Sequence, residues 1–433
     1  MSQSDSAVTF PPTAAPVALP VRQRLRSARS LVLGGSLVML VSMLLVNGFN
    51  FGYNIFMARV LGPSEFGHIN AAVTILLIAS CASLAFQLVC AKFVARNDNA
   101  GARVSVIRSL LGNAWVVSLV LAALLFFAQK PIASYLNLPS PWILGLLAIG
   151  VAVYAPLGVK RGAMQGLCSF TRLGSNFVLE AFTRLIAGVG LVVVGYGVLG
   201  AVGAISAGVI MAYFLPSLPR ELRVHPVPGE PASFAEALQA IVFFVGQVII
   251  NNIDILLVKH FFPADPAGVY AAIAQIGRLL YFICWFGVVN AMFPVTASRT
   301  DHDKSEAVGV PMLLVLGISV LFVLGAALFP HFIMGLIFGS KFISIGPLLA
   351  LYAAATGLYS MAVVLIAYEM SQRIANTGWL QLLVSGALVL VIGFFHHSLR
   401  EVIMVRIVLM VIMLALVSFP FVRRLTRAPL EAA

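Results

Sequence analysis

Long apolar runs separated by short polar segments dominate this chain. Twelve runs are long enough for a helix that crosses a bilayer, which needs about 20 apolar residues. The segments between them are rich in polar residues, Pro and Gly, as turns are. The pattern predicts an all-α polytopic membrane protein with twelve transmembrane helices, at residues 31–57, 68–91, 107–128, 142–160, 174–195, 197–215, 237–261, 267–295, 309–330, 343–367, 377–396 and 399–422.

The composition agrees with this prediction. Hydrophobic residues make up 61% of the chain and charged residues 10%, whereas soluble domains have about 45–50% apolar and about 25% charged residues. The net charge is +12, and most of the charged residues lie between the apolar runs. Such positions are typical of membrane topology, so we expect no nucleic-acid partner. The cysteines and histidines lack metal-ligand spacing, and we predict no metal site and no cofactor.

The distribution of Lys and Arg predicts the orientation. Nineteen of the 27 lie in segments that are cytoplasmic if the N-terminus is inside, and five lie in the outer segments. Cytoplasmic loops of membrane proteins carry such an excess of basic residues. We therefore expect a multi-pass protein with both termini cytoplasmic.

The longest connection between predicted helices, residues 216–236, lies halfway along the chain. It predicts two six-helix lobes, an N-lobe at 31–215 and a C-lobe at 237–422, joined by a cytoplasmic linker. The flanking segments are expected to be a disordered cytoplasmic tail at 1–30 and a basic cytoplasmic tail at 423–433.

Two predicted helical hairpins share the same order of sequence features. Residues 50–69 and 251–270 each contain the end of a long helix, a short turn with Pro and an acid, and a Gly that opens the next helix. Equivalent positions at an offset of 201 are Asn50 and Asn251, Gly67 and Gly268, and Ala71 and Ala272. Both copies run in one direction through the membrane, which predicts pseudo-twofold lobes with a binding site between them.

Four charged residues inside the predicted spans are the candidate site residues: Arg184, Arg278, Glu180 and Asp254. A charge at mid-bilayer costs at least ~2.5–3.5 kcal/mol, so such residues usually face a cavity or a partner. Glu180 lies one helical turn before Arg184, and Asp254 lies at nearly the depth of Arg278. Each acid is therefore interpreted either as the charge partner of that arginine or as a site for a proton or sodium ion.

Two further charges, Arg406 and Glu369, fit pairing or snorkelling roles. No ATPase phosphate-binding motif is present, so any energy for transport is expected from an ion gradient, the membrane potential or consumption of the cargo.

Five stretches resemble the Wzx-type polysaccharide flippases of the MOP superfamily. They are MARVLGPSEFGHINAA (57–72), MQGLCSF (164–170), IDILLVKHFFPADPAGVYAAIAQ (253–275), NAMFPVTAS (290–298) and LIFGSKFISIGPLLAL (336–351). The resemblance covers about residues 31–422. It implies a V-shaped pair of lobes around a central cavity. Many members of the superfamily have fourteen helices, whereas this chain supports twelve.

The resemblance also implies a function. Such flippases move undecaprenyl-pyrophosphate-linked oligosaccharides, such as O-antigen or exopolysaccharide repeat units, across the bacterial inner membrane by alternating access. Arg278 and Arg184 would bind the pyrophosphate, one from each lobe, because guanidinium donors match phosphate oxygens. Asp254 or Glu180 would bind a coupling proton or sodium ion. Expected partners are the lipid-linked cargo, membrane lipid and glycan polymerase or export machinery, and the expected state is a monomer.

Two other function classes compete with a flippase. A MATE-type small-molecule antiporter would share the fold and lobes, but two arginines in the membrane suit an anionic cargo better than a cationic drug. A membrane glycosyltransferase or polymerase would need a sizeable outer loop, and none is predicted here. We therefore predict no catalytic residues and no enzyme activity.

Overall fold

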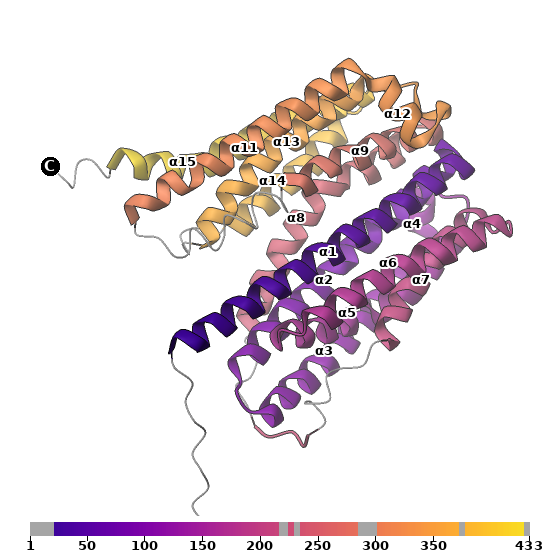
Figure 1. Ribbon diagram of the computed structural model, residues 1–433. Helices are drawn as coiled ribbons and strands as arrows, with labels where there is room; N and C mark the ends of the chain where they lie inside the picture. The colour runs from indigo at the N-terminus through magenta and orange to yellow at the C-terminus, as the bar shows by residue number, and fades with distance from the viewer. Residues whose placement is uncertain (1–20, 216–223, 229–233, 285–300, 372–376, 428–433) are drawn as a thin grey trace, which may run out of the picture.

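The computed structural model describes residues 21–215, 224–228, 234–284, 301–371 and 377–427, and its regular elements are helices (Figure 1). The helices are α1 (Val21–Leu61), α2 (Pro63–Arg96), α3 (Ala100–Phe127), α4 (Gln129–Tyr135), α5 (Trp142–Gly166), α6 (Phe170–Val193), α7 (Gly197–Phe214), α8 (Phe234–Phe261), α9 (Ala264–Cys284), α11 (Asp301–Leu328), α12 (Pro330–Phe338), the 3-10 turn η3 (Ser340–Phe342), α13 (Leu348–Ser371), α14 (Thr377–Phe394) and α15 (Leu399–Arg427).

The helices form two bundles, which we call the N-lobe (α1–α7) and the C-lobe (α8–α15). In the N-lobe, α5 packs against α2, α3 and α7, while α6 packs against α1 and α7. In the C-lobe, α13 packs against α9, α11 and α15, and α8 packs against α14. Helix α2 contacts both α8 and α9, so the first hairpin of each lobe forms the boundary between the lobes.

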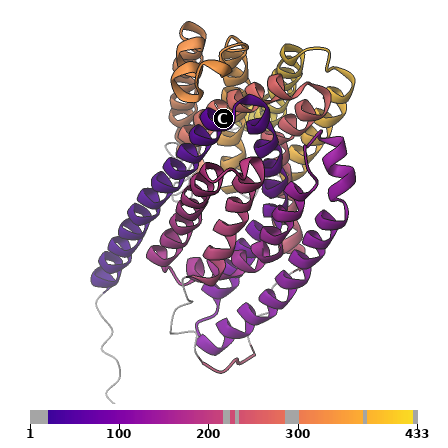
Figure 2. The ribbon, with the colours of Figure 1, turned by 90° about the vertical axis from the view of Figure 1, so that its right-hand side faces the viewer.

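The lobes are close together at one end and spread toward the other. The short helices α4 and α12 lie at the close end, whereas the N-terminus of α1 and the C-terminus of α15 lie at the opposite end (Figure 1). A view at right angles shows the same separation into two groups of helices (Figure 2). We call the end with α4 and α12 the joined end.

Eleven of the described helices are long and apolar enough to cross a membrane. The predicted span at 377–396 corresponds to α14, whose described side chains, Trp379–Phe394, form an apolar stretch shorter than a full span. The all-helical membrane fold is thus confirmed, while the count of twelve spans stays a prediction. The boundary between the predicted spans 174–195 and 197–215 is a turn at Gly195, whose φ of 104° suits a residue without a Cβ.

Several helices extend beyond the predicted spans. Helix α1 begins at Val21, inside the segment predicted to be a disordered tail, and α15 continues to Arg427, inside the predicted basic tail. Helix α5 continues to Gly166, past the predicted end at residue 160. Hydropathy marks only the part of a helix that must face lipid, so polar turns at its ends escape such a prediction.

Some predicted features lie outside the described residues. These are residues 1–20 of the predicted tail, 216–223 and 229–233 of the predicted linker, 285–295 at the end of the eighth predicted span, the resembling stretch 290–298, and 428–433 at the C-terminus.

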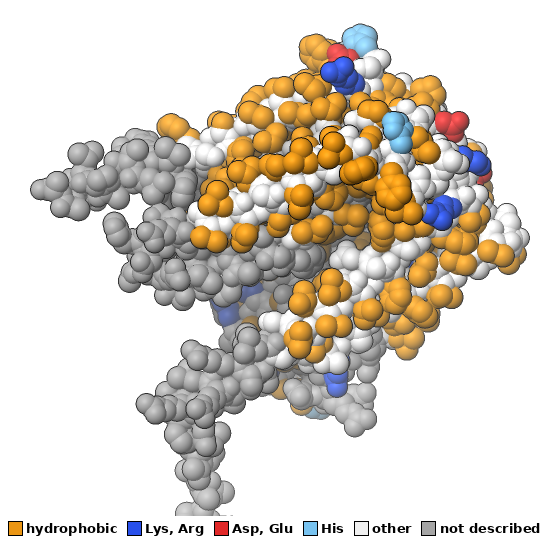
Figure 3. Space-filling model, turned by 45° about the horizontal axis from the view of Figure 1, so that its top comes forward, with side chains coloured by type: hydrophobic (Ala, Val, Ile, Leu, Met, Phe, Trp, Pro, Cys, Tyr) orange, Lys and Arg blue, Asp and Glu red, His pale blue; other side chains and the backbone are white. Residues whose placement is uncertain are grey.

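The outer surface of the bundle is apolar. Leu, Val, Ile and Phe side chains such as Leu321, Leu44 and Phe127 are largely exposed. Hydrophobic side chains cover the flank in view, while most of the charged ones lie toward the upper and right-hand edges (Figure 3). This distribution, together with the long apolar helices, makes the chain a multi-pass membrane protein, because only lipid stabilises so much exposed apolar surface.

Candidate functional site

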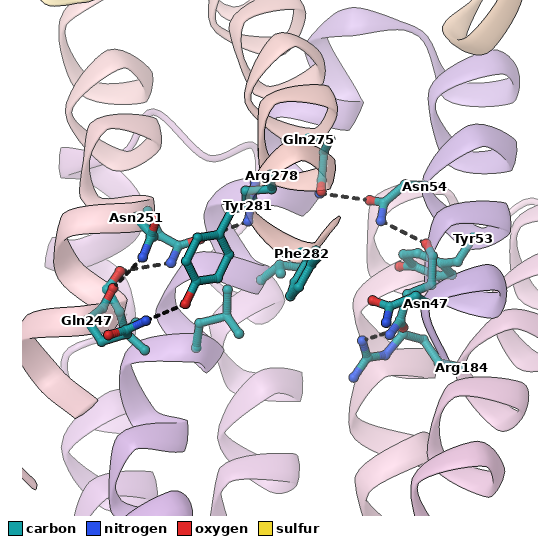
Figure 4. A pocket seen from close by; sticks show the side chains of 15 residues that line it. Asn47, Tyr53, Asn54, Arg184, Gln247, Asn251, Gln275, Arg278, Tyr281 and Phe282 are labelled. Carbon is teal, nitrogen blue, oxygen red and sulfur yellow. Dashed lines mark hydrogen bonds between the residues drawn. The ribbon is translucent and has the colours of Figure 1, made fainter. Parts of the chain in front are cut away.

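A cavity of about 270 Å³ lies between the two lobes (Figure 4). Its walls come from α1, α2 and α6 on one side and from α8 and α9 on the other. The lining residues are Asn47, Asn50, Tyr53, Asn54, Val73, Leu77, Arg184, Gln247, Val248, Asn251, Asn252, Gln275, Arg278, Tyr281 and Phe282. We call this space the interlobe cavity.

The two repeated hairpins form most of this cavity. They are α1–α2 and α8–α9, and the equivalent residues Asn50 and Asn251 both line it. The equivalent glycines meet near the joined end, where a Cβ on Gly67 would lie 3.1 Å from the Cα of Gly268. Contact between equivalent positions is what a pseudo-twofold relation of the lobes produces. The repeat read from the sequence therefore builds the lobe boundary.

Side chains close the joined end of the lobe boundary. The Arg59 guanidinium of α1 donates to the carbonyl oxygens of Leu336 and Ile337 at the end of α12. The Tyr135 ring stacks on His260 at a centroid distance of 3.7 Å. These contacts join the N-lobe and the C-lobe directly.

The Phe66 ring adds an apolar contact at the same end. It is fully buried and packs against the Phe338 and Phe342 rings of the C-lobe. Closer to the cavity, the Gln275 amide donates to Asn70 Oδ1 at 2.8 Å and to Asn54 Oδ1 at 3.2 Å. Figure 4 shows the Gln275 and Asn54 side chains meeting above the cavity.

Arg278 contributes a positive charge from the C-lobe wall. Its Nη1 donates to Asn252 Oδ1 at 2.8 Å, and its Nε lies 3.4 Å from the Ala274 carbonyl oxygen. Its Nη2 is buried and has no hydrogen-bond partner among the described residues. No acid lies within ion-pair distance of Arg278 in the described part of the chain. Among the described residues, the guanidinium is therefore held by neutral oxygens only.

Arg184 contributes the positive charge of the N-lobe wall. Its Nη1 donates to Asn50 Oδ1 at 3.0 Å, and its Nη2 lies 3.0 Å from Glu180 Oε1. The predicted pairing of Glu180 with Arg184 is therefore present. The other carboxylate oxygen, Oε2, accepts from Arg161 Nη2 at 2.6 Å. Glu180 thus bridges two arginines.

Arg161 was not predicted to belong to the site. It follows Lys160 in the sequence, and such a basic pair at the end of a predicted span suggested a cytoplasmic segment. Because α5 continues for another turn and a half, Arg161 is instead 4% exposed inside the N-lobe. Its Nε donates to Asn176 Oδ1 at 2.7 Å, and its guanidinium lies over the Phe177 ring.

The predicted pairing of Asp254 with Arg278 is wrong. Asp254 Oδ2 lies 2.5 Å from Arg406 Nη1 of α15 and accepts from the hydroxyl groups of Tyr270 and Tyr352. Asn252 and Asp254 point in nearly opposite directions, because two residues turn an α-helix by about 200°. Asn252 therefore faces Arg278 and the cavity, while Asp254 faces the interior of the C-lobe.

Arg406 was expected to pair or snorkel, and it pairs. Its side chain is 1% exposed, and its partner Asp254 is 0% exposed. The guanidinium also lies over the Tyr352 ring, with 4.5 Å between the guanidinium carbon and the ring centroid. Asp254 is not among the described residues that line the interlobe cavity. The side chain of Glu369 lies outside the described residues.

The cavity is suited to bind an anion with hydroxyl groups around it. Two arginines face it from opposite lobes, and none of its described lining residues is acidic. Carboxamides, which both donate and accept hydrogen bonds, supply most of the remaining polar surface: Asn47, Asn50, Asn54, Gln247, Asn251, Asn252 and Gln275. Across the described ranges, no group of three or more His, Cys, Asp or Glu residues could hold a metal ion.

Solved structures of two membrane transporters resemble this fold. A lipid II flippase, MurJ, in an inward closed conformation aligns with a TM-score of 0.73 at 12% identity, over 89% of this chain and 87% of its own. A multidrug resistance MATE family transporter in an inward-facing conformation aligns with a TM-score of 0.67 at 14% identity, over 92% of this chain and 100% of its own. The second belongs to the MOP superfamily. The chain therefore shares its fold with these two transporters.

Sequence comparison gives one relative in two strains and a family. An uncharacterized protein of Mycobacterium tuberculosis, found in strains CDC 1551 and H37Rv, is 24% identical over 283 residues. The match spans 63% of this chain and 65% of the relative, slightly under two thirds of its length. The family model described as polysaccharide biosynthesis protein matches residues 56–347. Because that match covers more than half of the chain, the chain belongs to the polysaccharide biosynthesis protein family.

Proposed function

We propose that this protein is a flippase for undecaprenyl-pyrophosphate-linked oligosaccharides in the bacterial inner membrane. It moves the repeat unit of an O-antigen or exopolysaccharide from the cytoplasmic to the periplasmic face by alternating access of its two lobes. The family and the fold support a transporter of polysaccharide biosynthesis. The observation that carries the proposal is the pair Arg184 and Arg278, which face one cavity from opposite lobes.

The charge of the cavity fits this cargo. A pyrophosphate esterified at both ends is a dianion, and arginines bind phosphate oxygens with planar, charge-assisted hydrogen bonds. Arg278 is the stronger candidate contact, because no described acid lies within ion-pair distance of it and its buried Nη2 has no described partner. A phosphate oxygen would supply that partner.

The size of the cavity suggests which part of the cargo it binds. Its volume of about 270 Å³ is near the lower end of ligand pockets, which span roughly 300–1,000 Å³. We infer that it holds the pyrophosphate and the adjoining sugar, with the carboxamides on the sugar hydroxyls. A longer glycan and the isoprenoid chain then extend beyond it. The expected partners are this cargo, membrane lipid and glycan polymerase or export machinery, and the transporter acts as a monomer.

The joined end, and the opposite end at which the lobes spread apart, fit one step of the transport cycle. With both termini cytoplasmic, the ends of α1 and α15 that spread apart face the cytoplasm, and the joined end faces the periplasm. This state receives cargo from the cytoplasmic side. Release on the other side requires Arg59, His260 and Gln275 to leave their partners across the lobe boundary.

A MATE-type exporter of small molecules is the alternative function, since a MATE transporter shares the fold. The absence of acids among the described lining residues argues against an organic cation as cargo. Uptake of an organic cation into inverted membrane vesicles tests this alternative directly. Proton- or sodium-driven cation uptake by the wild-type protein would favour it over the flippase.

Replacement of Arg278 tests the flippase. In a strain that lacks the chromosomal gene, Arg278→Ala at matched membrane level should abolish surface polysaccharide and cause lipid-linked repeat units to accumulate. Arg278→Lys should restore part of the export, because lysine keeps the charge and loses the planar fork.

Arg400→Ala is the matched control, since Arg400 is exposed at the start of α15, away from the interlobe cavity. It should export normally. Normal export by Arg278→Ala would contradict the proposed role of the arginine.

A further inference from the structure

The Glu180 cluster contains one carboxylate between two arginines of unequal burial. The Arg161 side chain is 5% exposed, and the Arg184 side chain is 16% exposed. The Arg161 contact is also the shorter, at 2.6 Å against 3.0 Å for Arg184. Asn176 fixes Arg161 further, because it accepts from that guanidinium and donates to the Ala212 carbonyl at 2.6 Å. Glu180 is thus anchored on the Arg161 side.

Arg184 lies between two cavities. A second cavity of about 200 Å³ lies inside the N-lobe and is bordered by Arg161, Glu180 and Arg184. Of these three residues, only Arg184 also lines the interlobe cavity. The contact between Arg184 and Glu180 therefore has empty space beside it, whereas side chains in a packed core have almost none. Such a contact can separate without disturbing the packing of the lobe.

The charges of the cluster leave one positive charge in excess. Arg161 and Arg184 are cationic, and Glu180 alone opposes them. An anion that takes Arg184 leaves Glu180 paired with Arg161, so that no buried charge is left unpaired. The same anion finds Arg278 on the opposite wall. A pyrophosphate dianion would thus meet two guanidinium groups.

We propose that Glu180 is an internal competitor of the cargo pyrophosphate for Arg184. The carboxylate neutralises Arg184 while the interlobe cavity is empty. When cargo enters, its pyrophosphate displaces Glu180 from Arg184, and Glu180 stays bound to Arg161. This inference rests on the proposed flippase function and adds a residue that sets the affinity for the cargo.

The competition has a use in transport. A carrier that binds its cargo too tightly cannot release it, just as an ion site must be weak enough to be left. Glu180 weakens cargo binding, because its contact with Arg184 must be broken first. The contact forms again when the cargo leaves. Glu180 is a positioning residue in this scheme, since it acts through Arg184 and does not touch the cargo.

Binding of geranyl diphosphate to the full-length protein in detergent tests the inference. This probe carries the diphosphate on a short isoprenoid, and geraniol serves as its neutral counterpart. Glu180→Gln should bind geranyl diphosphate about tenfold more tightly than wild type, the size expected for removal of one charge-assisted contact. Export by the same variant should be slower, because release becomes harder. A purely structural role of Glu180 would weaken binding.

A second variant covers the risk that Glu180→Gln fails to fold with Arg161 left unpaired. The double variant R161Q/E180Q removes both partners together, which avoids an unpaired buried charge. It should also bind the probe about tenfold more tightly. Arg184→Ala should cost more affinity in the Glu180→Gln background than in wild type, because Glu180 no longer competes there.

Glu401→Gln is the matched control. It removes the same charge at a partly exposed position on α15, where the carboxylate contacts His397, and it should leave probe affinity unchanged. Unchanged or weaker binding by both Glu180 variants, with Arg184→Ala and Arg278→Ala still weakening the wild type, would overturn this inference alone. A wild-type protein that does not bind geranyl diphosphate would overturn the proposed function with it. Failure of both Glu180 variants to fold would assign Glu180 a structural role and equally reject the inference.

Discussion

Each lobe buries a carboxylate against an arginine, but the arginine of the N-lobe pair lines the interlobe cavity, and that of the C-lobe pair is not among the described lining residues. Glu180 contacts Arg184, which lines the interlobe cavity. Asp254 is 0% exposed and contacts Arg406, Tyr270 and Tyr352 inside the C-lobe. Both acids lie inside predicted apolar spans, but their surroundings in the folded protein differ.

This difference determines whether a nearby acid neutralises the arginine that lines the interlobe cavity in each lobe. Because Asp254 faces away, Arg278 keeps a charge that no described acid within ion-pair distance neutralises. Because Glu180 faces Arg184, that charge is partly neutralised until an anion replaces the carboxylate. An acid–arginine pair therefore stabilises the interior of the C-lobe, whereas the corresponding pair of the N-lobe belongs to the proposed binding surface.

The largest expected effect concerns the C-lobe cluster. Arg406→Met leaves Asp254 buried without a cation, and breaking a buried pair in this way costs about 3–5 kcal/mol. Thermal unfolding in detergent should show a clear loss of stability. D254N/R406M should recover much of it, because neutral side chains of similar size remove the unpaired charge. An equally unstable double variant would show that the ion pair itself stabilises the lobe, and an unchanged Arg406→Met would contradict the pairing.

The next effect compares the two cavity arginines in one binding assay. Arg278→Ala should weaken geranyl diphosphate binding about 100-fold, since two charge-assisted hydrogen bonds contribute about 3 kcal/mol or more. Arg184→Ala should weaken geranyl diphosphate binding less, by about tenfold, because breaking the Arg184–Glu180 contact offsets part of the free energy that Arg184 contributes to binding. Equal losses from the two variants, measured by calorimetry, would mean that Glu180 does not distinguish the two lobes.

The sequence was sufficient to predict the long apolar helices and both arginines that line the cavity, but not the short helices α4 and α12. Lipid requires long apolar helices, so hydropathy marked their positions. Arg184 and Arg278 stood out because charges within apolar spans are rare. The repeat at an offset of 201 also placed Asn50 and Asn251 at equivalent positions, and both line the cavity.

The partners of the charges could not be predicted in the same way. Depth along a helix does not give the direction in which a side chain points, so Asp254 and Arg278 seemed natural partners. The actual partner, Arg406, comes from a helix 152 residues later. Arg161 was missed because its neighbour Lys160 made it resemble a loop charge. The first error concerns rotation about a helix axis, and the second concerns the extension of α5 beyond its predicted span. Hydropathy records neither.

The smallest expected effects concern the carboxamides that orient the arginines. Asn252 accepts from Arg278 at 2.8 Å, and Asn50 accepts from Arg184 at 3.0 Å. Asn252→Ala should weaken probe binding about fivefold, because a lost hydrogen bond that contributes about 1 kcal/mol lowers affinity by that factor. Asn50→Ala should have a smaller effect, about twofold, because Glu180 still holds Arg184 in place.

Combining Asn50→Ala with Glu180→Gln sharpens this last comparison. With the carboxylate gone, Asn50 is the one described group that still orients Arg184. The loss caused by Asn50→Ala should therefore rise from about twofold to about fivefold in that background, matching Asn252→Ala in the C-lobe. Such a rise would mean that the two lobes bind anions alike once Glu180 is removed, so that the acid alone accounts for their difference. A loss that stays at about twofold would instead assign the orientation of Arg184 to the packing around it.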